Sequence, residues 1–134
     1  MIALSNTSSG ATGALSYYLG TNYRVGHGLA GACFIGKICK FNHSNGYHDY
    51  SQIYDYIFPN NLYKNNKRKS KAFVDILNNL IKNSSIPRSI TELGFKNSEI
   101  NNFVSFYKNN KKPFSQNPIK FKIIDVKSII NSKY

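Results

Sequence analysis

Residues 27–42 read HGLAGACFIGKICKFN and are the most informative stretch of the chain. From Leu29 to Phe41 the side chains are apolar on nearly every side of a helix, until Lys37 and Lys40. A helix that is apolar all round belongs in the centre of a fold. Small residues in the stretch let neighbouring backbones come close: Gly28, Ala30, Gly31, Ala32 and Gly36. The stretch therefore predicts a central, buried helix over residues 29–41.

The rest of the chain also has helical spacing. Residues 7–23 suggest a helix that closes at Gly20, in the position of a left-handed C-cap. Ser89 and Glu92 make a capping box for a short helix that Gly94 stops. A polar, basic loop is expected over residues 60–70. Further helices are predicted over residues 47–58 (ended by Pro59), 72–81, 100–107 and 126–130.

No segment shows the sustained period-two alternation of a half-buried strand. Asn45-Gly46 is the one hairpin-type turn, and both of its flanks read as helices. We therefore predict an all-α fold of six or seven helices. With 134 residues, 41% of them hydrophobic, the chain is long enough for one domain but too short for a cofactor domain plus a substrate domain.

The chain is strongly basic, with 18 Lys and Arg against 6 Asp and Glu and a formal net charge of +12. Such a balance points to anionic partners. However, the basic residues are mostly Lys and accompany abundant Asn, Ile and Tyr, all encoded by A/T-rich codons. Genome composition explains the charge as well as a selected partner does. We expect at most weak, non-specific nucleic-acid binding, by the cluster Lys64, Lys67, Arg68, Lys69 and Lys71.

Cys33 and Cys39 stand six residues apart, on opposite faces of the predicted helix, so a disulfide between them is not expected. Reduced cysteines fit a cytoplasmic protein. We expect no membrane partner, because no apolar run approaches the roughly 18 residues of a membrane span. The N-terminus also lacks the pattern of a signal peptide.

Three groups of residues have both a chemical and a structural interpretation. Gly31 to Lys37 matches the start of a phosphate-binding loop, but Ile38 replaces the hydroxyl residue and helix packing explains the glycines better. Four further residues could be metal ligands: Cys39, His43, His48 and Asp49. Their spacing matches no compact zinc motif, and solvated loop histidines are the simpler interpretation. The serines near the N-terminus have no catalytic base at a recognisable spacing and are expected to cap a helix: Ser5, Ser8 and Ser9.

His27 is flanked by Gly26 and Gly28 at the start of the predicted central helix. A histidine without neighbouring side chains can point into a cleft. Spacing alone leaves two interpretations open, a metal ligand or a structural residue.

The run from His27 to Asn42 resembles the signature helix of the iron-containing (group III) alcohol dehydrogenases, HGxANAxxxPxVxxxN. The segment 86–95, IPRSITELGF, is similar to the family's P-x-x-L-x-E-L-G-I segment. The end of the chain resembles the family's closing motif, NNPRPxTxxDVxxILxxAY, at Gln116-Asn-Pro118, residues 125–130 and Tyr134. The three matches occur in family order. Among the departures from the family pattern, Gly31 stands at its Asn and Gly36 at its Pro.

This resemblance implies that residues 1–134 are one helical domain, part of the C-terminal domain of the dehydroquinate synthase-like/iron alcohol dehydrogenase fold. It implies an N-terminal dinucleotide-binding domain that the sequence lacks. Family members hold a divalent metal, iron or zinc, with one Asp and three His, and use NAD(P). His27 corresponds to the last of these histidines. Gly13 stands 14 residues earlier, at the position of another, and the Asp and first His would precede Met1.

By resemblance, the function is therefore a metal-dependent, NAD(P)-linked alcohol dehydrogenase or aldehyde reductase. The chain alone is expected to be inactive and to hold neither metal nor NAD(P). One alternative is a non-enzymatic helical remnant, or a partner subunit for a separately encoded cofactor domain or for a second copy. A basic nucleic-acid-binding module is the weaker alternative.

Overall fold

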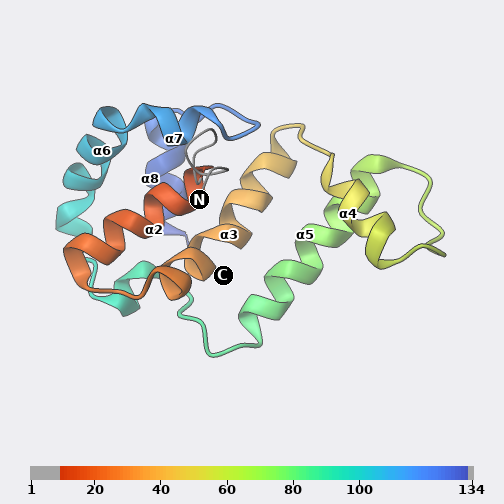
Figure 1. The fold of residues 1–134 in the computed structure, drawn as a ribbon, viewed down its shortest axis with the longest axis horizontal. Coiled ribbons are helices and arrows are strands. Elements are labelled where there is room, and N and C mark those ends of the chain that lie inside the picture. The colour runs from red at the N-terminus through yellow and green to blue at the C-terminus, as the bar shows by residue number, and fades with distance from the viewer. Residues whose placement is uncertain (1–9, 133–134) are drawn as a thin grey trace, which may run out of the picture.

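Helix α3 (His27–Ser44) runs through the middle of the computed structural model, which describes residues 10–132 (Figure 1). Helix α2 (Gly10–Tyr23) and the C-terminal helices lie on one side of α3, and the pair α4 and α5 lies on the other. The remaining elements are α4 (Tyr50–Ile57), α5 (Asn66–Lys82), η1 (Ile90–Leu93), η2 (Asn97–Glu99), α6 (Ile100–Asn109), α7 (Lys111–Ser115) and α8 (Ile123–Asn131). Residues 10–132 contain no strand, which confirms the all-α prediction.

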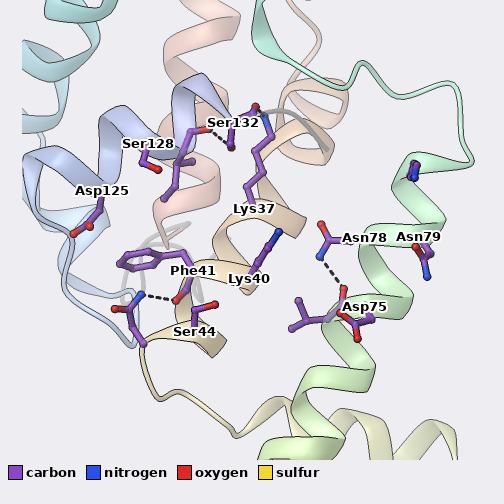
Figure 2. A pocket seen from close by; sticks show the side chains of 14 residues that line it. Lys37, Lys40, Phe41, Ser44, Asp75, Asn78, Asn79, Asp125, Ser128 and Ser132 are labelled. Carbon is purple, nitrogen blue, oxygen red and sulfur yellow. Dashed lines mark hydrogen bonds between the residues drawn. The ribbon is translucent and has the colours of Figure 1, made fainter.

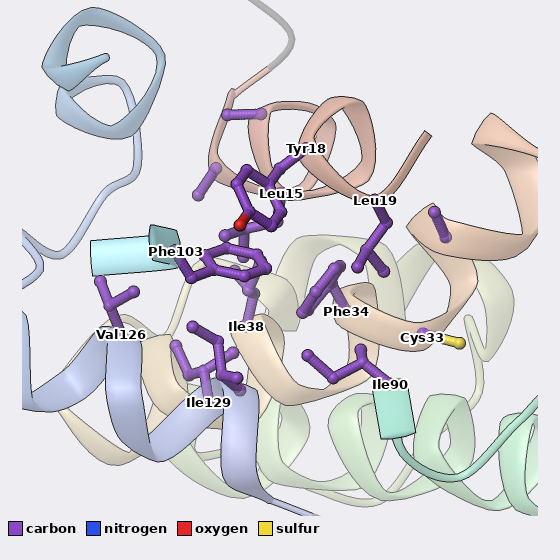
Figure 3. Packing of buried hydrophobic residues seen from close by; sticks show 14 of the residues in the cluster. Leu15, Tyr18, Leu19, Cys33, Phe34, Ile38, Ile90, Phe103, Val126 and Ile129 are labelled. Atoms are coloured by element: carbon purple, nitrogen blue, oxygen red, sulfur yellow. The ribbon is translucent and has the colours of Figure 1, made fainter. Parts of the chain in front are cut away.

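The core surrounds the middle of α3 (Figure 3). Phe34 and Cys33 of α3 are fully buried, and Phe103 of α6 meets the Phe34 ring edge-on with centroids 6.3 Å apart. Other helices add further apolar side chains: Leu15, Tyr18 and Leu19 from α2, Ile90 from η1, and Val126 and Ile129 from α8. The predicted central helix is confirmed.

However, α3 is not buried on every side. Leu29 and Ile35 are 42% and 40% exposed, although their apolar character predicted burial. Lys37, expected to interrupt the apolar surface, is only 6% exposed. The reason is that α4 and α5 lie on one side of α3 and α2 on another, so part of the helix surface has no neighbour among the described residues.

The predicted end of the first helix at Gly20 is wrong. Helix α2 continues to Tyr23, and the left-handed residue that follows it is Arg24, with φ +55°. An added Cβ at Gly20 would meet only the Val25 carbonyl oxygen, at 3.4 Å. Gly20 is thus an ordinary helical residue, and the chain turns three residues later than its glycine indicated.

The predicted loop over residues 60–70 is shorter than expected. Helix α5 begins at Asn66, because the Asn65 side chain accepts hydrogen bonds from the backbone N–H groups of Lys67 and Arg68. This is a standard N-cap. As a consequence Ser70, assigned to the loop by the sequence, is fully buried within a helix.

The short helix over Ile90–Leu93 is a 3₁₀ turn, and Gly94 stops it with φ +96°, as predicted. The predicted capping box of Ser89 and Glu92 does not form. The Glu92 carboxylate accepts hydrogen bonds from the Arg88 N–H and the Ser89 hydroxyl, both over 3.3 Å, but the Ser89 side chain accepts none from the helix. Two short elements, η2 and α7, were not predicted.

Cys33 and Cys39 are both buried and form no disulfide with each other, as predicted. No helix within residues 10–132 is long and apolar enough to cross a membrane. Ser5, Ser8, Ser9 and Tyr134 lie outside the described residues.

Candidate functional site

His27 is the first residue of α3 and is exposed. It follows a sharp turn in which Arg24 is left-handed and Gly26 serves as N-cap without a side-chain hydrogen bond. Built Cβ atoms on Gly26 and Gly28 would meet nothing within 4 Å. The imidazole therefore extends from an uncrowded helix end, where it is accessible to a ligand or a partner.

Gly13, at the position of a second family histidine, lies in the first turns of α2 and is buried. Glycine has no side-chain donor, so this position supplies no metal ligand.

Within residues 10–132, no three His, Cys, Asp or Glu side chains gather as a group that could hold a metal ion. A catalytic divalent metal of this type needs about three protein ligands. The described residues thus do not fit the metal that the family resemblance implies. His27 is the single candidate ligand they offer at this helix end.

The second proposed metal cluster is only partly assembled. The rings of His43 and His48 lie 5.1 Å apart, and His43 Nδ1 is 2.9 Å from the Ser70 hydroxyl. Burial lowers the pKa of His43 and raises the pKa of the Cys39 thiol, which interacts with the Tyr50 hydroxyl. Asp49 is exposed at the start of α4. The interpretation of His43 as a solvated loop histidine is also wrong, because it lies in the last turn of α3 and bridges to α5.

The phosphate-loop match occurs inside α3, where its backbone N–H groups belong to the helix. A Cβ on Gly31 would lie 3.3 Å from Ser16 Oγ of α2, so this glycine lets the two helices approach closely. Lys37 at the end of the match donates a hydrogen bond to the Ser132 carbonyl oxygen over 2.7 Å. The structure therefore supports the helix-packing interpretation of these residues.

Several residues that carry the family resemblance have structural contacts. Asn42, at the end of the signature run, exchanges hydrogen bonds with Asn117 of the closing motif. Pro87 of the middle motif presents its carbonyl oxygen to Cys33 Sγ at 3.4 Å. The three motifs, distant in sequence, thus meet around α3. Sequence reasoning recognised the motifs but missed these contacts, because no periodicity shows which buried amides will pair.

Comparison with known proteins identifies the family of this chain. The model of the Fe-containing alcohol dehydrogenase family, C-terminal part, matches residues 1–134. The chain belongs to this family. No curated protein sequence matches the chain.

Two solved structures contain a region with a similar fold. A 1,3-propanediol oxidoreductase is 19% identical, with a TM-score of 0.76 over 90% of this chain and 31% of its own. An alcohol dehydrogenase from Oenococcus oeni is 19% identical, with a TM-score of 0.79 over 99% of this chain and 34% of its own. The chain therefore spans about a third of the length of these two proteins and shares the fold of the part that it matches.

Proposed function

We propose that this chain is a helical part of a metal-dependent, NAD(P)-linked alcohol dehydrogenase or aldehyde reductase, and that it is active only together with a cofactor domain. The observation that carries this proposal is His27, exposed at an uncrowded helix end, with Gly13 in place of a second ligand. The described residues supply one candidate ligand and no strand for a dinucleotide-binding sheet. We therefore place the nucleotide site and the remaining metal ligands on a cofactor domain outside these residues.

Exposed apolar side chains support a protein partner. Tyr56, Leu62 and Leu80 are 89%, 93% and 66% exposed on the α4–α5 side, and Ile124 of α8 is 67% exposed. Apolar groups that lie together in solvent mark interaction surfaces, and the exposed Ile57, Phe58, Leu62 and Tyr63 line one hollow after α4. A separately encoded cofactor domain is the proposed occupant, and self-association is the alternative when that domain is missing. Nucleic-acid binding is proposed only as a weak, non-specific property.

A cytoplasmic location is part of this proposal. The two buried free thiols support it, since such cysteines persist in reducing compartments.

The test is reconstitution. The chain is assayed for alcohol-dependent reduction of NAD and NADP with Fe²⁺ or Zn²⁺, alone and after co-expression with the nucleotide-binding domain of a full-length family member. We expect no turnover by the chain alone and turnover in the complex. His27→Ala should abolish that turnover, whereas Asn22→Ala, an exposed change at the neighbouring end of α2, should not.

Two outcomes would contradict the proposal. Turnover by the chain alone would show that it is a complete enzyme. A stable complex without turnover, or with turnover insensitive to His27→Ala, would favour the non-enzymatic helical subunit.

A further inference from the structure

A hollow of about 440 Å³ opens between α3, α5 and α8 (Figure 2). This volume is within the range of small-molecule sites. The hollow begins near Lys37, ten residues along α3 from His27, which is about 15 Å of helix rise. It is therefore well removed from the helix end that carries the proposed function. Its wall includes Lys37 and Lys40 of α3, Lys82 of α5 and Ser128 of α8.

The wall carries an excess of positive charge. Lys40 of α3 and Lys82 of α5 are exposed and form no ion pair within residues 10–132. Lys37 is buried beside them, with its ammonium on the Ser132 carbonyl oxygen. Figure 2 shows Lys40 directed into the space between α3 and α5.

The two acidic residues of the wall are already engaged. The Asp75 carboxylate pairs with Lys71, one turn earlier on α5. The Asp125 carboxylate accepts the Lys122 backbone N–H over 2.8 Å at the start of α8. The Lys71 ammonium offsets the Asp75 charge, and the wall has three lysines against two aspartates, so an anion in the hollow would face a net positive surface.

Neutral groups complete the wall. Ser44, Asn79 and Ser128 bring hydroxyl and amide groups from three different helices. Phe41, Val74 and Ile129 contribute apolar surface. A few polar groups set among apolar ones are typical of sites for small organic molecules rather than for bare ions.

We propose that this hollow binds a small hydroxylated phosphomonoester, with Lys40 and Lys82 on the phosphate and the serine and asparagine side chains on the hydroxyl groups. A phosphomonoester carries a charge of about −1.5 to −2 near neutral pH, which two lysines match. Lysine binds phosphate as a point charge and needs no fixed fork geometry.

The test uses three probes at constant ionic strength: glucose 6-phosphate, glucose and inorganic phosphate. Binding is measured by calorimetry and located by amide shifts in ¹H–¹⁵N spectra. We expect saturable binding of glucose 6-phosphate, weaker binding of inorganic phosphate and none of glucose, with shifts confined to α3, α5 and α8. Lys40→Gln and Lys82→Gln should each lower affinity about tenfold, the effect of losing one charged hydrogen bond.

Lys108→Gln is the matched control, since it removes the same charge from an exposed position on α6, outside the hollow. The affinity of the Lys108→Gln variant for glucose 6-phosphate should equal that of the unaltered chain. Thermal unfolding of each variant checks that the fold is intact, as expected for substitutions at exposed positions. The proposal is overturned by equal weakening in Lys108→Gln, by binding of glucose, or by the absence of saturation at about 10 mM probe. None of these readouts depends on a cofactor domain, so the result is separable from the reconstitution test.

Discussion

The side-chain amides of Asn42 and Asn117 form a reciprocal hydrogen-bonded pair across 75 residues of sequence. Asn42 Nδ2 donates to Asn117 Oδ1 over 3.2 Å, and Asn117 Nδ2 donates to Asn42 Oδ1 over 2.6 Å. Their remaining N–H groups donate to the Tyr50 hydroxyl and the Ile119 carbonyl oxygen. The pair links α3 to the turn after α7 and satisfies both amides in a buried setting.

Removing one amide of this pair should destabilise the protein, because the other amide stays buried without its partner. Asn42→Leu leaves the Asn117 amide buried without its partner, and we expect a loss of about 1–3 kcal/mol in the free energy of unfolding. Asn117→Leu should behave similarly. In the double variant no orphaned amide remains, so its loss should be smaller than the sum of the two. Urea denaturation of all four proteins measures the coupling, and strict additivity would contradict a direct interaction.

Lys37 provides a pH-dependent prediction. Burial lowers its pKa from 10.5 to about 8 in the folded protein. Between about pH 8 and 10.5 the unfolded chain therefore binds more protons at this residue, so the Lys37 contribution to stability rises with pH in that window. Below pH 8 the folded protein bears the full cost of the buried charge, about 3 kcal/mol.

Lys37→Met removes that cost together with the hydrogen bond to Ser132, which offsets it by about 1 kcal/mol. We expect the variant to be more stable than the unaltered chain at pH 7, with the advantage shrinking steadily toward pH 10.5. Denaturant unfolding at several pH values, with exposed Lys108→Met as control, measures this difference. An advantage that is constant across the range would show that Lys37 titrates normally in the folded state.

The end of α2 can be tested with two substitutions. Gly20→Ala should raise the free energy of unfolding by about 0.5–1 kcal/mol, because alanine is the better helix-interior residue. Arg24→Gly should cost nothing or stabilise, since glycine adopts the left-handed conformation without the penalty of about 1 kcal/mol borne by arginine. Thermal denaturation of both variants and of the unaltered chain measures these changes in stability. If Gly20 were the left-handed cap, its replacement by alanine would destabilise the protein instead.

The basic cluster should bind nucleic acid weakly and through charge alone. Lys69 pairs with Asp55, and Lys71 pairs with Asp75, so within residues 10–132 only Lys64, Lys67 and Arg68 of the cluster lack an ion pair. Replacing Lys67 and Arg68 by Gln should lower the slope of log affinity against log salt by about 2 for duplex DNA, one for each lost phosphate contact. Fluorescence anisotropy at several salt concentrations measures the slope. Sub-micromolar, sequence-dependent binding at physiological salt would show a dedicated nucleic-acid site.

Helical spacing was sufficient to predict the fold class and the central position of α3. Those predictions rest on local periodicity, which the chain carries whether or not its neighbours are known. The failures occurred where packing overrides local preference. At Gly20 the residue type indicated a helix end, yet the helix continues to Tyr23 and an arginine takes the left-handed conformation. At Leu29 and Ile35 apolar character indicated burial, yet no described helix covers them.

The sequence by itself determined the all-α class, the central position of α3, the absence of a disulfide between Cys33 and Cys39, and the family resemblance. These follow from residue type and spacing along the chain, and the resemblance in turn pointed to His27 as the candidate ligand. Only the tertiary structure decided that Asn42 meets Asn117, that Lys37 is buried against Ser132, and that the family-related motifs converge on α3. The physical reason is that hydrogen bonds between residues 54 to 95 positions apart depend on how the helices pack, and no local pattern encodes that distance.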